Sequence, residues 1–350
     1  MTPDPKSAEL IAPAAGTGAP VPPPSDPLGV SIVIPVYQGE KTLEGLTGEI
    51  ETLAAETKTP AGRRFRVTEV ILVHDGAIDR SADVMQALAA RHKFLSLVWL
   101  SRNFGQHPAT LAGMAATVSD WVLTMDEDGQ QDPGDIGAML DCALDRSATL
   151  VYGSPVNPPP HGWFRNAASR VAKWVCSVVT GERQVRMFNS FRLIRGDLAR
   201  SLAAYCGPGI YLDVALLWVV SSAESCPVTL RPERGRPSGY SLLKLILHFW
   251  RLIVCSGTRP LRAIALLGLS SLLVGVFISG KAVWEKLHYQ IPVQGWTSLM
   301  IVVCFFSGVI LFSLAVIVEY LGQALTLAMG KPLYLTVHGA PPTKAVRRAP

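Results

Sequence analysis

The chain has 350 residues, 49% of them hydrophobic, and a mean hydropathy of +0.29, which is too apolar for an ordinary soluble enzyme. Its formal net charge is +5, yet it has no zinc-finger spacing and no basic-aromatic RNA motif. The charge therefore favours a membrane surface or phosphate ligands, and we expect no nucleic-acid partner. The six cysteines are scattered without a C-x-x-C pair, which argues against a disulfide framework.

The N-terminal two thirds of the chain predicts a disordered tail and one α/β domain. Residues 1–28 are rich in Pro, Ala and Gly and lack apolar periodicity, which is typical of disorder. From residue 29 to 238, short apolar runs alternate with helical patterns, which predicts a mainly parallel sheet with helices on both faces. The expected strands are 30–36, 67–73, 95–100, 121–125 and 149–152, and the expected helices are 41–57, 81–92, 109–118 and 163–180.

Polar clusters follow three of these strands, at residues 74–76, 101–105 and 126–128. The carboxyl ends of parallel strands meet at one edge of a sheet, which is where such folds bind ligands. The carboxylates of the third cluster, with the amide oxygen of Gln130 nearby, suit a hard cation such as Mg²⁺ or Mn²⁺ that would grip a diphosphate. The alternative is an acidic loop that only caps the next helix near Asp132.

Residues 239–262 contain a candidate interfacial helix. Lys244, His248 and Arg251 are spaced by four and three residues, so they form one basic stripe on an otherwise apolar helix. This pattern is typical of a helix that lies in a membrane interface with its cations at the lipid headgroups. A core helix with three solvent-facing residues is the alternative.

Residues 263–328 predict a transmembrane hairpin, because 263–280 and 297–318 are almost wholly apolar and about long enough to span a bilayer. Lys and Arg are more frequent in the two flanks than in the linking loop. The positive-inside rule then places both flanks, the α/β domain and the tail 329–350 in the cytoplasm, with the chain a multi-pass protein of the inner membrane. Two buried helices of a soluble protein are the alternative.

The motifs of the chain, in their order, resemble those of the family-2 glycosyltransferases. Within that family, the two apolar segments make the chain similar to the polyprenyl-phosphate glycosyltransferases, which include dolichol-phosphate-mannose synthases and undecaprenyl-phosphate sugar transferases. The resemblance covers about residues 30–336 and implies the nucleotide-sugar-binding GT-A fold. It rests on I-P-V-Y at 34–37, V-H-D-G at 73–76, S-R-N-F-G-Q-H at 101–107, M-D-E-D-G-Q at 125–130, F-R-L at 191–193 and G-R-P-S-G-Y-S at 235–241.

The resemblance assigns roles to residues near the nucleotide. It implies that Pro35, Tyr37 and Asp75 hold the base and ribose. Asp126 matches the first acid of the family's D-x-D motif, near the ribose and diphosphate, while Asp128 and Gln130 match the ligands of the metal. Asp126 and Asp128 are thus the residues expected to carry catalysis.

The resemblance also assigns a site for the acceptor phosphate. Arg165 and Ser169 match an Arg-x-x-x-Ser pair that grips the phosphate of the lipid, and Arg192, Arg231 or Arg234 are candidates to add to that site. Arginine suits this role because its guanidinium binds phosphate in a bidentate manner. Arg192 pairing with a structural carboxylate is the alternative.

We therefore expect the transfer of one sugar from a nucleotide sugar to a polyprenyl phosphate at the cytoplasmic face of the membrane. The reaction would be assisted by Mg²⁺ or Mn²⁺ and would invert the anomeric centre, and the membrane lipid would be a partner. A homo-oligomer is compatible with the resemblance. Two alternatives remain: a transferase that uses another lipid acceptor, or a degenerate membrane-anchored scaffold that binds nucleotide sugar. His74 and Ser190 depart from the family pattern and motivate the second alternative.

Overall fold

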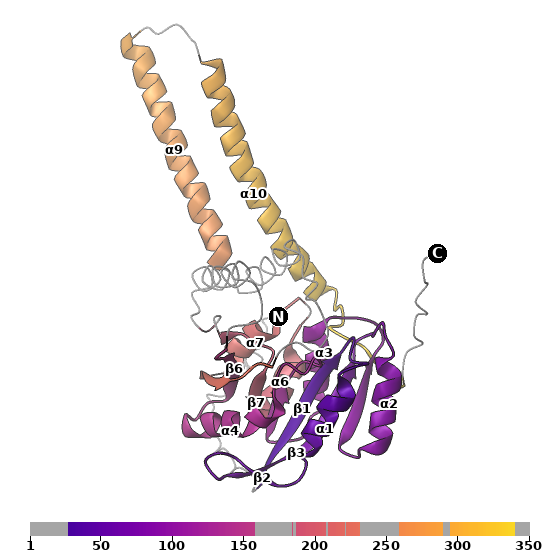
Figure 1. Cartoon of the computed structure of the whole chain (residues 1–350). Coiled ribbons are helices and arrows are strands. Elements are labelled where there is room, and N and C mark those ends of the chain that lie inside the picture. The colour runs from indigo at the N-terminus through magenta and orange to yellow at the C-terminus, as the bar shows by residue number, and fades with distance from the viewer. Residues whose placement is uncertain are drawn as a thin grey trace, which may run out of the picture.

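A nine-stranded sheet forms the core of the α/β domain, and two long helices extend from it (Figure 1). The structure is a computed structural model that describes residues 27–157, 184, 187–207, 209–220, 222–231, 259–289 and 295–339. The predicted tail up to residue 26, the predicted helix 163–180 and the basic stripe of the predicted interfacial helix lie outside these residues. The strand order is β8-β6-β7-β5-β1-β3-β4-β9, with β2 paired to β3.

The strands are β1 (Leu28–Val36), β2 (Thr57–Lys58), β3 (Arg64–His74), β4 (Leu95–Leu100), β5 (Trp121–Thr124), β6 (Leu150–Pro155), β7 (Arg192–Arg195), β8 (Ala223–Val228) and β9 (Thr336–Val337). The block β4-β3-β1-β5 is parallel, as is the β6–β8 pair. Strand β7 is antiparallel to both β5 and β6, and the short β2 and β9 are antiparallel to their partners. The prediction of a mainly parallel sheet holds for the central block and for the β6–β8 pair, but it is wrong at β2, β7 and β9, so the sheet is mixed.

Helices cover both faces of the sheet, as predicted. One face carries α1 (Leu43–Glu51), α2 (Ser81–Arg91) and α4 (Ile136–Asp145), which follows the 3₁₀ turn η1 (Pro133–Asp135). The other carries α3 (Gln106–Ala115), α6 (Gly196–Tyr205) and α7 (Leu212–Val219). Strand β1 is buried on both sides, and its side chains alternate between the two cores, with Ile32 in the first and Val33 in the second.

Several predicted boundaries differ from the structure. The helix expected over 41–57 ends at Glu51, and the helix expected over 109–118 begins at Gln106. The sequence patterns did not reveal β7, α6, α7 or β8 as elements. The earlier start of α3 matters for function, because it places Gln106 and His107 in the first turn of a helix at the carboxyl edge of the sheet.

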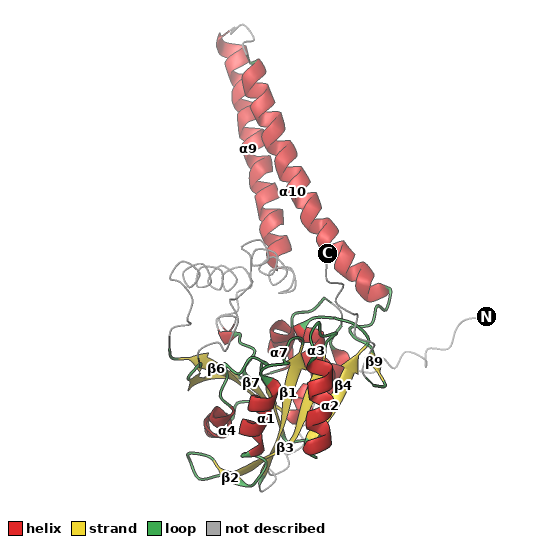
Figure 2. Ribbon diagram, turned by 45° about the vertical axis from the view of Figure 1, so that its right-hand side comes forward, coloured by secondary structure: helices red, strands yellow, loops and turns green. Residues whose placement is uncertain are grey.

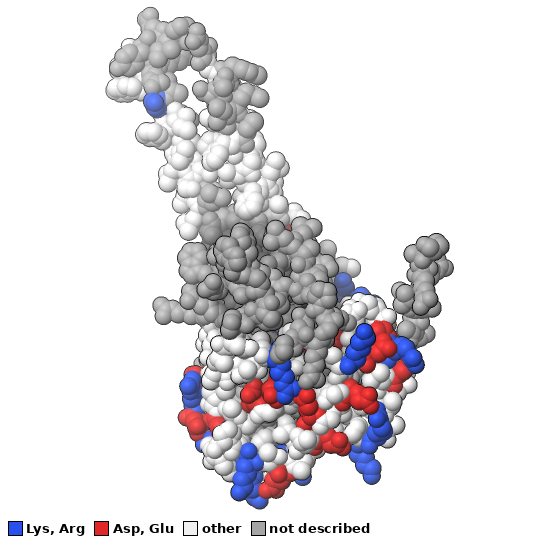
Figure 3. Space-filling model, in the orientation of Figure 1, with Lys and Arg blue, Asp and Glu red and all other residues white. Residues whose placement is uncertain are grey.

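The C-terminal helices are α9 (Arg259–Tyr289) and α10 (Trp296–Ala328), which pack against each other (Figure 2). Among the described residues, one stretch, Phe305–Ala328 in α10, is long and apolar enough to cross a membrane, with a mean hydropathy of 2.0. It lies further along the chain than the span expected at 297–318. The apolar stretch of α9, Gly268–Ile278, is shorter. Figure 3 shows that charged side chains gather on the α/β domain and are nearly absent from the visible described part of the two helices.

The chain returns from α10 to the edge of the sheet. Strand β9 pairs with β4, and the carbonyl of Leu335 accepts a hydrogen bond from the amide of Ser101 (2.9 Å). Leu333 and Tyr334 pack against the second core. The segment that leaves the apolar helix is thus bonded to the residue that immediately follows β4, so the carboxyl edge of the sheet is tied to the end of α10.

Gly113 allows α3 to approach the sheet closely. A Cβ atom there would lie 2.3 Å from Cγ1 of Val33 and 2.9 Å from Cγ2 of Val73, and both valines are fully buried. Gly113→Ala should therefore lower the unfolding free energy by about 1–3 kcal/mol through overpacking, despite the better helix propensity of alanine. Thermal unfolding of the full chain in detergent measures this. Gly48→Ala, on the exposed side of α1 with open space around it, is the control and should not destabilise; equal midpoints for the two variants would contradict the packing argument.

Candidate active site

The carboxyl end of β5 continues into an acidic loop, defined here as residues 126–132, which lies beside the end of β1. Strands β1 and β5 run parallel, and beyond the last pair the amide of Met125 donates to the carbonyl of Val33 (3.1 Å). The loop turns at Gly129, whose φ of +72° is a conformation that favours glycine. The predicted acids and the I-P-V-Y motif therefore meet at one edge of the sheet.

Glu127 joins the ends of the two strands. Its carboxylate accepts hydrogen bonds from the amides of Tyr37 (3.0 Å) and Gln38 (2.9 Å). These bonds orient the carboxylate toward the end of β1, so Glu127 connects the acidic loop to that strand. Tyr37, predicted to hold the nucleotide, is 39% exposed at this edge.

Asp126 is held by donors from three separate segments. Its carboxylate accepts from Nε2 of Gln106 at the start of α3 (2.6 Å), from Oγ of Ser190 just before β7 (2.6 Å) and from Nε2 of Gln131 (3.2 Å). The amide of Asp126 also donates to Oε1 of Gln131 (2.8 Å). Burial raises the pKa of Asp126 to about 6, against the opposing effect of the Ser190 hydrogen bond, and nearby Asp128 raises it further.

Asp128 and Gln130 lie together in the turn of the acidic loop. Oδ1 of Asp128 accepts a hydrogen bond from the amide of Gln130 (3.0 Å), and both residues are partly exposed. The described residues include no group of three or more His, Cys, Asp or Glu side chains that could hold a metal. The donor set, a carboxylate and an amide oxygen beside a second carboxylate, fits a hard cation that takes its remaining ligands from a diphosphate and water.

Asp75 organises the loop after β4. It is 3% exposed, and its carboxylate accepts from the amides of Phe104 (2.7 Å) and Gly105 (2.9 Å), while Nδ2 of Asn103 donates to its carbonyl (3.0 Å). Burial raises the pKa of Asp75 to about 6, although the two amide hydrogen bonds lower it. Both carboxylate oxygens are thus already used to shape the loop that leads to Gln106.

His74, which departs from the family pattern, is buried next to Asp75. Its ring lies 5.1 Å from that of Trp99, and burial lowers its pKa, which favours the neutral imidazole. Within the described chain, its Nδ1 makes no hydrogen bond. The residue therefore places an uncharged aromatic side chain at the end of β3.

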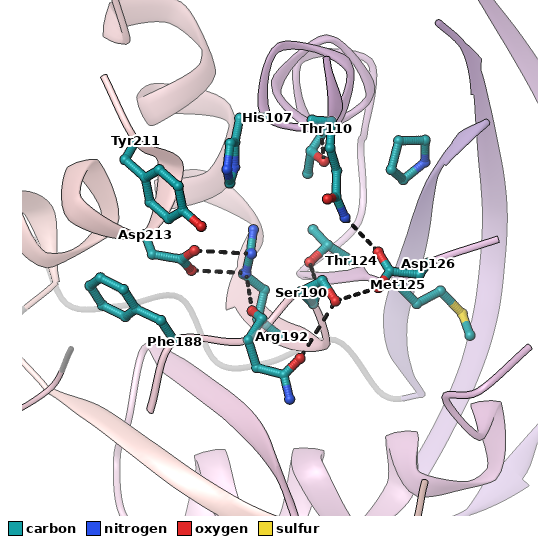
Figure 4. A pocket seen from close by; sticks show the side chains of 13 residues that line it. His107, Thr110, Thr124, Met125, Asp126, Phe188, Ser190, Arg192, Tyr211 and Asp213 are labelled. Atoms are coloured by element: carbon teal, nitrogen blue, oxygen red, sulfur yellow. Dashed lines mark hydrogen bonds and ion pairs between the residues drawn. The ribbon is translucent and has the colours of Figure 1, made fainter. Parts of the chain in front are cut away.

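A cavity of about 230 Å³ opens beside Asp126 (Figure 4). Aromatic rings form one wall: the ring of His107 lies 4.1 Å from that of Tyr211, which stacks on Phe188 at 6.5 Å. Polar side chains from α3, β5, β7 and α7 (Leu212–Val219) also line the cavity, so residues far apart in the sequence converge on it. It is lined by Pro35, Gln106, His107, Thr110, Thr124, Met125, Asp126, Phe188, Asn189, Ser190, Arg192, Tyr211 and Asp213.

Arg192 and Asp213 form a buried ion pair in this cavity. Their side chains are 4% and 3% exposed, with Nε of Arg192 3.2 Å from Oδ1 of Asp213, and the hydroxyl of Tyr152 donates to the same oxygen (3.0 Å). Arg192 is thus paired with a structural carboxylate, the alternative considered for it above. Its predicted contact with an acceptor phosphate stays a prediction.

Sequence reasoning missed several residues of this site. Gln106 belongs to a recognised motif, and Ser190 was noted only as a departure, but neither pattern indicated a hydrogen bond to Asp126. Asp213 lies in α7 and Tyr211 immediately precedes that helix, which no pattern revealed. The predicted acceptor residues Arg165, Ser169 and Arg234 lie outside the described residues, so their predicted roles stay untested.

Comparison with known proteins places these features in context. The sequence model of a family described as Glycosyl transferase family 2 matches residues 31–212, just over half of the chain. The chain is 28% identical over 308 residues to the undecaprenyl-phosphate 4-deoxy-4-formamido-L-arabinose transferase of Edwardsiella ictaluri, covering 87% of this chain and 92% of that protein. It is 29% identical to the transferase of the same name from Pectobacterium atrosepticum, over 89% of this chain and 95% of that one.

Among solved structures, the chain is similar to glucosyl-3-phosphoglycerate synthase from Mycobacterium tuberculosis in complex with Mn²⁺, UDP-glucose and phosphoglyceric acid. That similarity has a TM-score of 0.47 and 17% identity, and covers 66% of this chain and 79% of the other.

The pKa of Asp75 generates a prediction for stability. Because the folded pKa of about 6 lies above the ordinary value of 3.8, the carboxyl group stabilises the folded chain at low pH, and this contribution is lost as pH rises through about 6. The side chain introduced by Asp75→Asn stays neutral at every pH, so the variant does not lose this contribution. The unfolding free energy of the variant minus that of wild type should therefore increase by up to about 3 kcal/mol between pH 4 and pH 8.

Thermal unfolding midpoints across this pH range measure the effect. Asp83→Asn is the control, because Asp83 is an exposed acid on α2 that pairs with Arg80 (3.1 Å) and should follow wild type at every pH. Parallel pH profiles for wild type and Asp75→Asn would show that burial does not shift this group.

Proposed function

Because the chain belongs to the family-2 glycosyltransferases, we propose that it transfers a single sugar from a nucleotide sugar to a polyprenyl phosphate at the cytoplasmic face of the inner membrane. Relatives named undecaprenyl-phosphate sugar transferases, which align over most of both chains, support the choice of acceptor. One observation carries the proposal: the carboxyl edge of the sheet, where the acidic loop lies, is the edge to which the chain returns from α10, through the Ser101–Leu335 hydrogen bond of 2.9 Å. A soluble donor and a lipid acceptor can therefore meet there.

The acidic loop is the proposed site of the diphosphate. Asp128 and Gln130 would hold Mg²⁺ or Mn²⁺, which when bound neutralises the charge that develops on the leaving nucleoside diphosphate. At the start of the loop, the carboxylate of Asp126 is held in place by its three side-chain donors. Burial, with a smaller effect of the charge on Asp128, raises its pKa, and a cation bound nearby would favour its ionised form.

The nucleotide and the sugar would occupy neighbouring parts of the carboxyl edge of the sheet. Pro35 and Tyr37 lie where β1 ends, and Asp75 shapes the adjacent loop, so the base and ribose are proposed to bind there. The cavity beside Asp126 is of suitable size for one sugar ring, with hydroxyl and amide groups to orient it and the His107–Tyr211 pair as an aromatic wall.

The acceptor needs no strong general base. A phosphate monoester has a second pKa of about 6, so its attacking oxygen is already anionic at neutral pH. Consistent with this, Asp213, the other acid in the cavity, is paired with Arg192 and accepts a hydrogen bond from Tyr152. Catalysis then depends on positioning and charge neutralisation, and direct attack on the face opposite the diphosphate inverts the anomeric centre. Arg165, Ser169 and Arg234 are proposed to bind the acceptor phosphate.

The hairpin of α9 and α10 would anchor the enzyme as two membrane spans. At 33 residues, α10 is about 50 Å long, more than the roughly 30 Å of a bilayer core, so its last turns can reach the α/β domain. The more basic flanks favour the cytoplasmic side for the domain. Of the two departures that favoured the scaffold alternative, Ser190 no longer supports it, because Ser190 donates a hydrogen bond to Asp126 and is thus part of the site.

Transfer can be assayed with the purified full chain, undecaprenyl phosphate, Mn²⁺ or Mg²⁺ and a panel of labelled nucleotide sugars. We expect a lipid-linked monosaccharide phosphate, and a loss of at least about a hundredfold in Asp128→Ala, because several kcal/mol of metal-derived stabilisation would disappear. Asp83→Ala, on α2, should keep wild-type activity. Donor binding without turnover on any lipid would favour the scaffold, and label on a neutral lipid would favour the other transferase.

Membrane topology can be tested with single cysteines in a background that lacks the native ones. Gly295→Cys precedes α10, and Lys331→Cys follows it. In spheroplasts, a membrane-impermeant maleimide should label the first variant and should label the second only after lysis. Labelling of both or neither variant in intact spheroplasts would contradict the proposed crossing by α10.

A further inference from the structure

The segment that follows β8 contacts the acidic loop near the end of the loop, at Gln130 and Asp132. The guanidinium of Arg231 contacts two acids: Nη2 lies 2.7 Å from Oδ2 of Asp132, and Nη1 lies 2.5 Å from Oε2 of Glu49 on α1. The amide of Arg231 also donates to the carbonyl of Gln130 (2.8 Å). One residue therefore contacts the loop through both its main chain and its side chain.

The segment that carries Arg231 is itself fixed on both sides. The backbone of Thr229 lies close enough to the Asp135 carboxyl group in η1 to lower the pKa of that group, against the larger opposing effect of burial. On the other side, Nδ2 of Asn157 donates to the carbonyl of Leu230 (2.7 Å), and the amide of Leu230 donates to Oδ1 of Asn157 (3.0 Å). The position of Arg231 is thus set by Asn157, just after β6, and by η1.

These contacts make Arg231 a poor candidate for the acceptor phosphate, the role considered for it from the sequence. Its charge is shared between two carboxylates, and both hydrogen bonds raise its pKa. Its geometry instead suits it to hold the loop in one conformation. Gln131, Ser190 and Gln106 fix the start of the acidic loop at Asp126. At its other end, Asp132 caps η1 by accepting from the amide of Gly134 (2.8 Å) and also pairs with Arg231. The turn at Gly129 lies between the two ends.

We propose that Arg231 is a positioning residue that holds the acidic loop so that Asp128 and Gln130 can bind the divalent cation together. This inference rests on the proposed function, since it assigns the cation to that pair. The amide of Gln130 already donates to Asp128, so fixing the carbonyl of Gln130 also fixes the peptide that orients the carboxylate. Partners of this kind, one step removed from the metal, typically change metal affinity by about 10- to 100-fold when removed.

The direction in which cation affinity changes when Arg231 is removed distinguishes a positioning role from a purely electrostatic one. Removing a positive charge near a cation site should strengthen cation binding if charge alone matters. Removing a positioning residue should weaken it. Stability should change little in either case, because the side chains of Arg231, Asp132 and Glu49 are 29%, 36% and 33% exposed and such pairs contribute little to folding.

The test compares full-length wild type, Arg231→Ala and Arg231→Lys with a control, Arg146→Ala, which removes another partly exposed ion pair, to Glu224 (2.6 Å), at the end of α4. Binding of Mn²⁺ alone is followed by EPR of the free ion. Hydrogen exchange of the peptide covering residues 126–135 is measured without metal, and thermal midpoints verify folding. Arg231→Ala should bind Mn²⁺ about 10- to 100-fold more weakly and exchange faster in this peptide, with Arg231→Lys in between and the control unchanged.

Unchanged or tighter Mn²⁺ binding in a folded Arg231→Ala, or unchanged exchange of the loop, would overturn the inference and leave the proposed function standing. Failure of the proposed function is recognised separately, in the wild type. A wild-type chain that transfers sugar but binds no Mn²⁺, or that transfers none to any lipid phosphate, would overturn the assignment of the cation to Asp128 and Gln130 and the inference with it.

Discussion

The structure depends on holding carboxylates close together at the partly buried end of β5. Burial raises the pKa of Asp126 to about 6, and the hydrogen bonds from Ser190 and Gln131 oppose that shift. Gln106 from α3 also donates to this carboxylate. The carboxylate of Glu127 instead accepts hydrogen bonds from the two amides that follow β1. The neighbouring acids thus have distinct surroundings, and each environment decides whether the side chain supports the fold or faces a ligand.

A second constraint links this edge to the apolar helices. After α10, the chain adds β9 to the free edge of β4 and bonds to Ser101, the first residue of the loop that Asp75 organises and that leads to Gln106. Gln106 in turn donates to Asp126. A continuous set of hydrogen-bonded segments therefore connects the end of the apolar helix α10 with the carboxylate of Asp126. This connection suits an enzyme that joins a water-soluble donor to a lipid acceptor.

The central strands could be predicted from the sequence, because β1, β3, β4 and β5 each contain an apolar run and the last three end in polar clusters. The predicted family is confirmed. Strand β7 could not, because it has only four residues and starts and ends with arginine. Its Arg192 is buried only because Asp213, on a helix 21 residues later, neutralises it. Such long-range pairing leaves no local pattern, and the same holds for the contact of Arg231 with Asp132.

The most direct measurement of the central claim is a cryo-EM structure of the full chain in lipid nanodiscs with Mn²⁺ and the nucleoside diphosphate of its donor. The account predicts one ion at about 2.0–2.3 Å from a carboxylate oxygen of Asp128, bridging to the diphosphate, at the edge of the sheet that faces the lipid. A diphosphate bound away from the acidic loop, or an edge directed away from the bilayer, would contradict it.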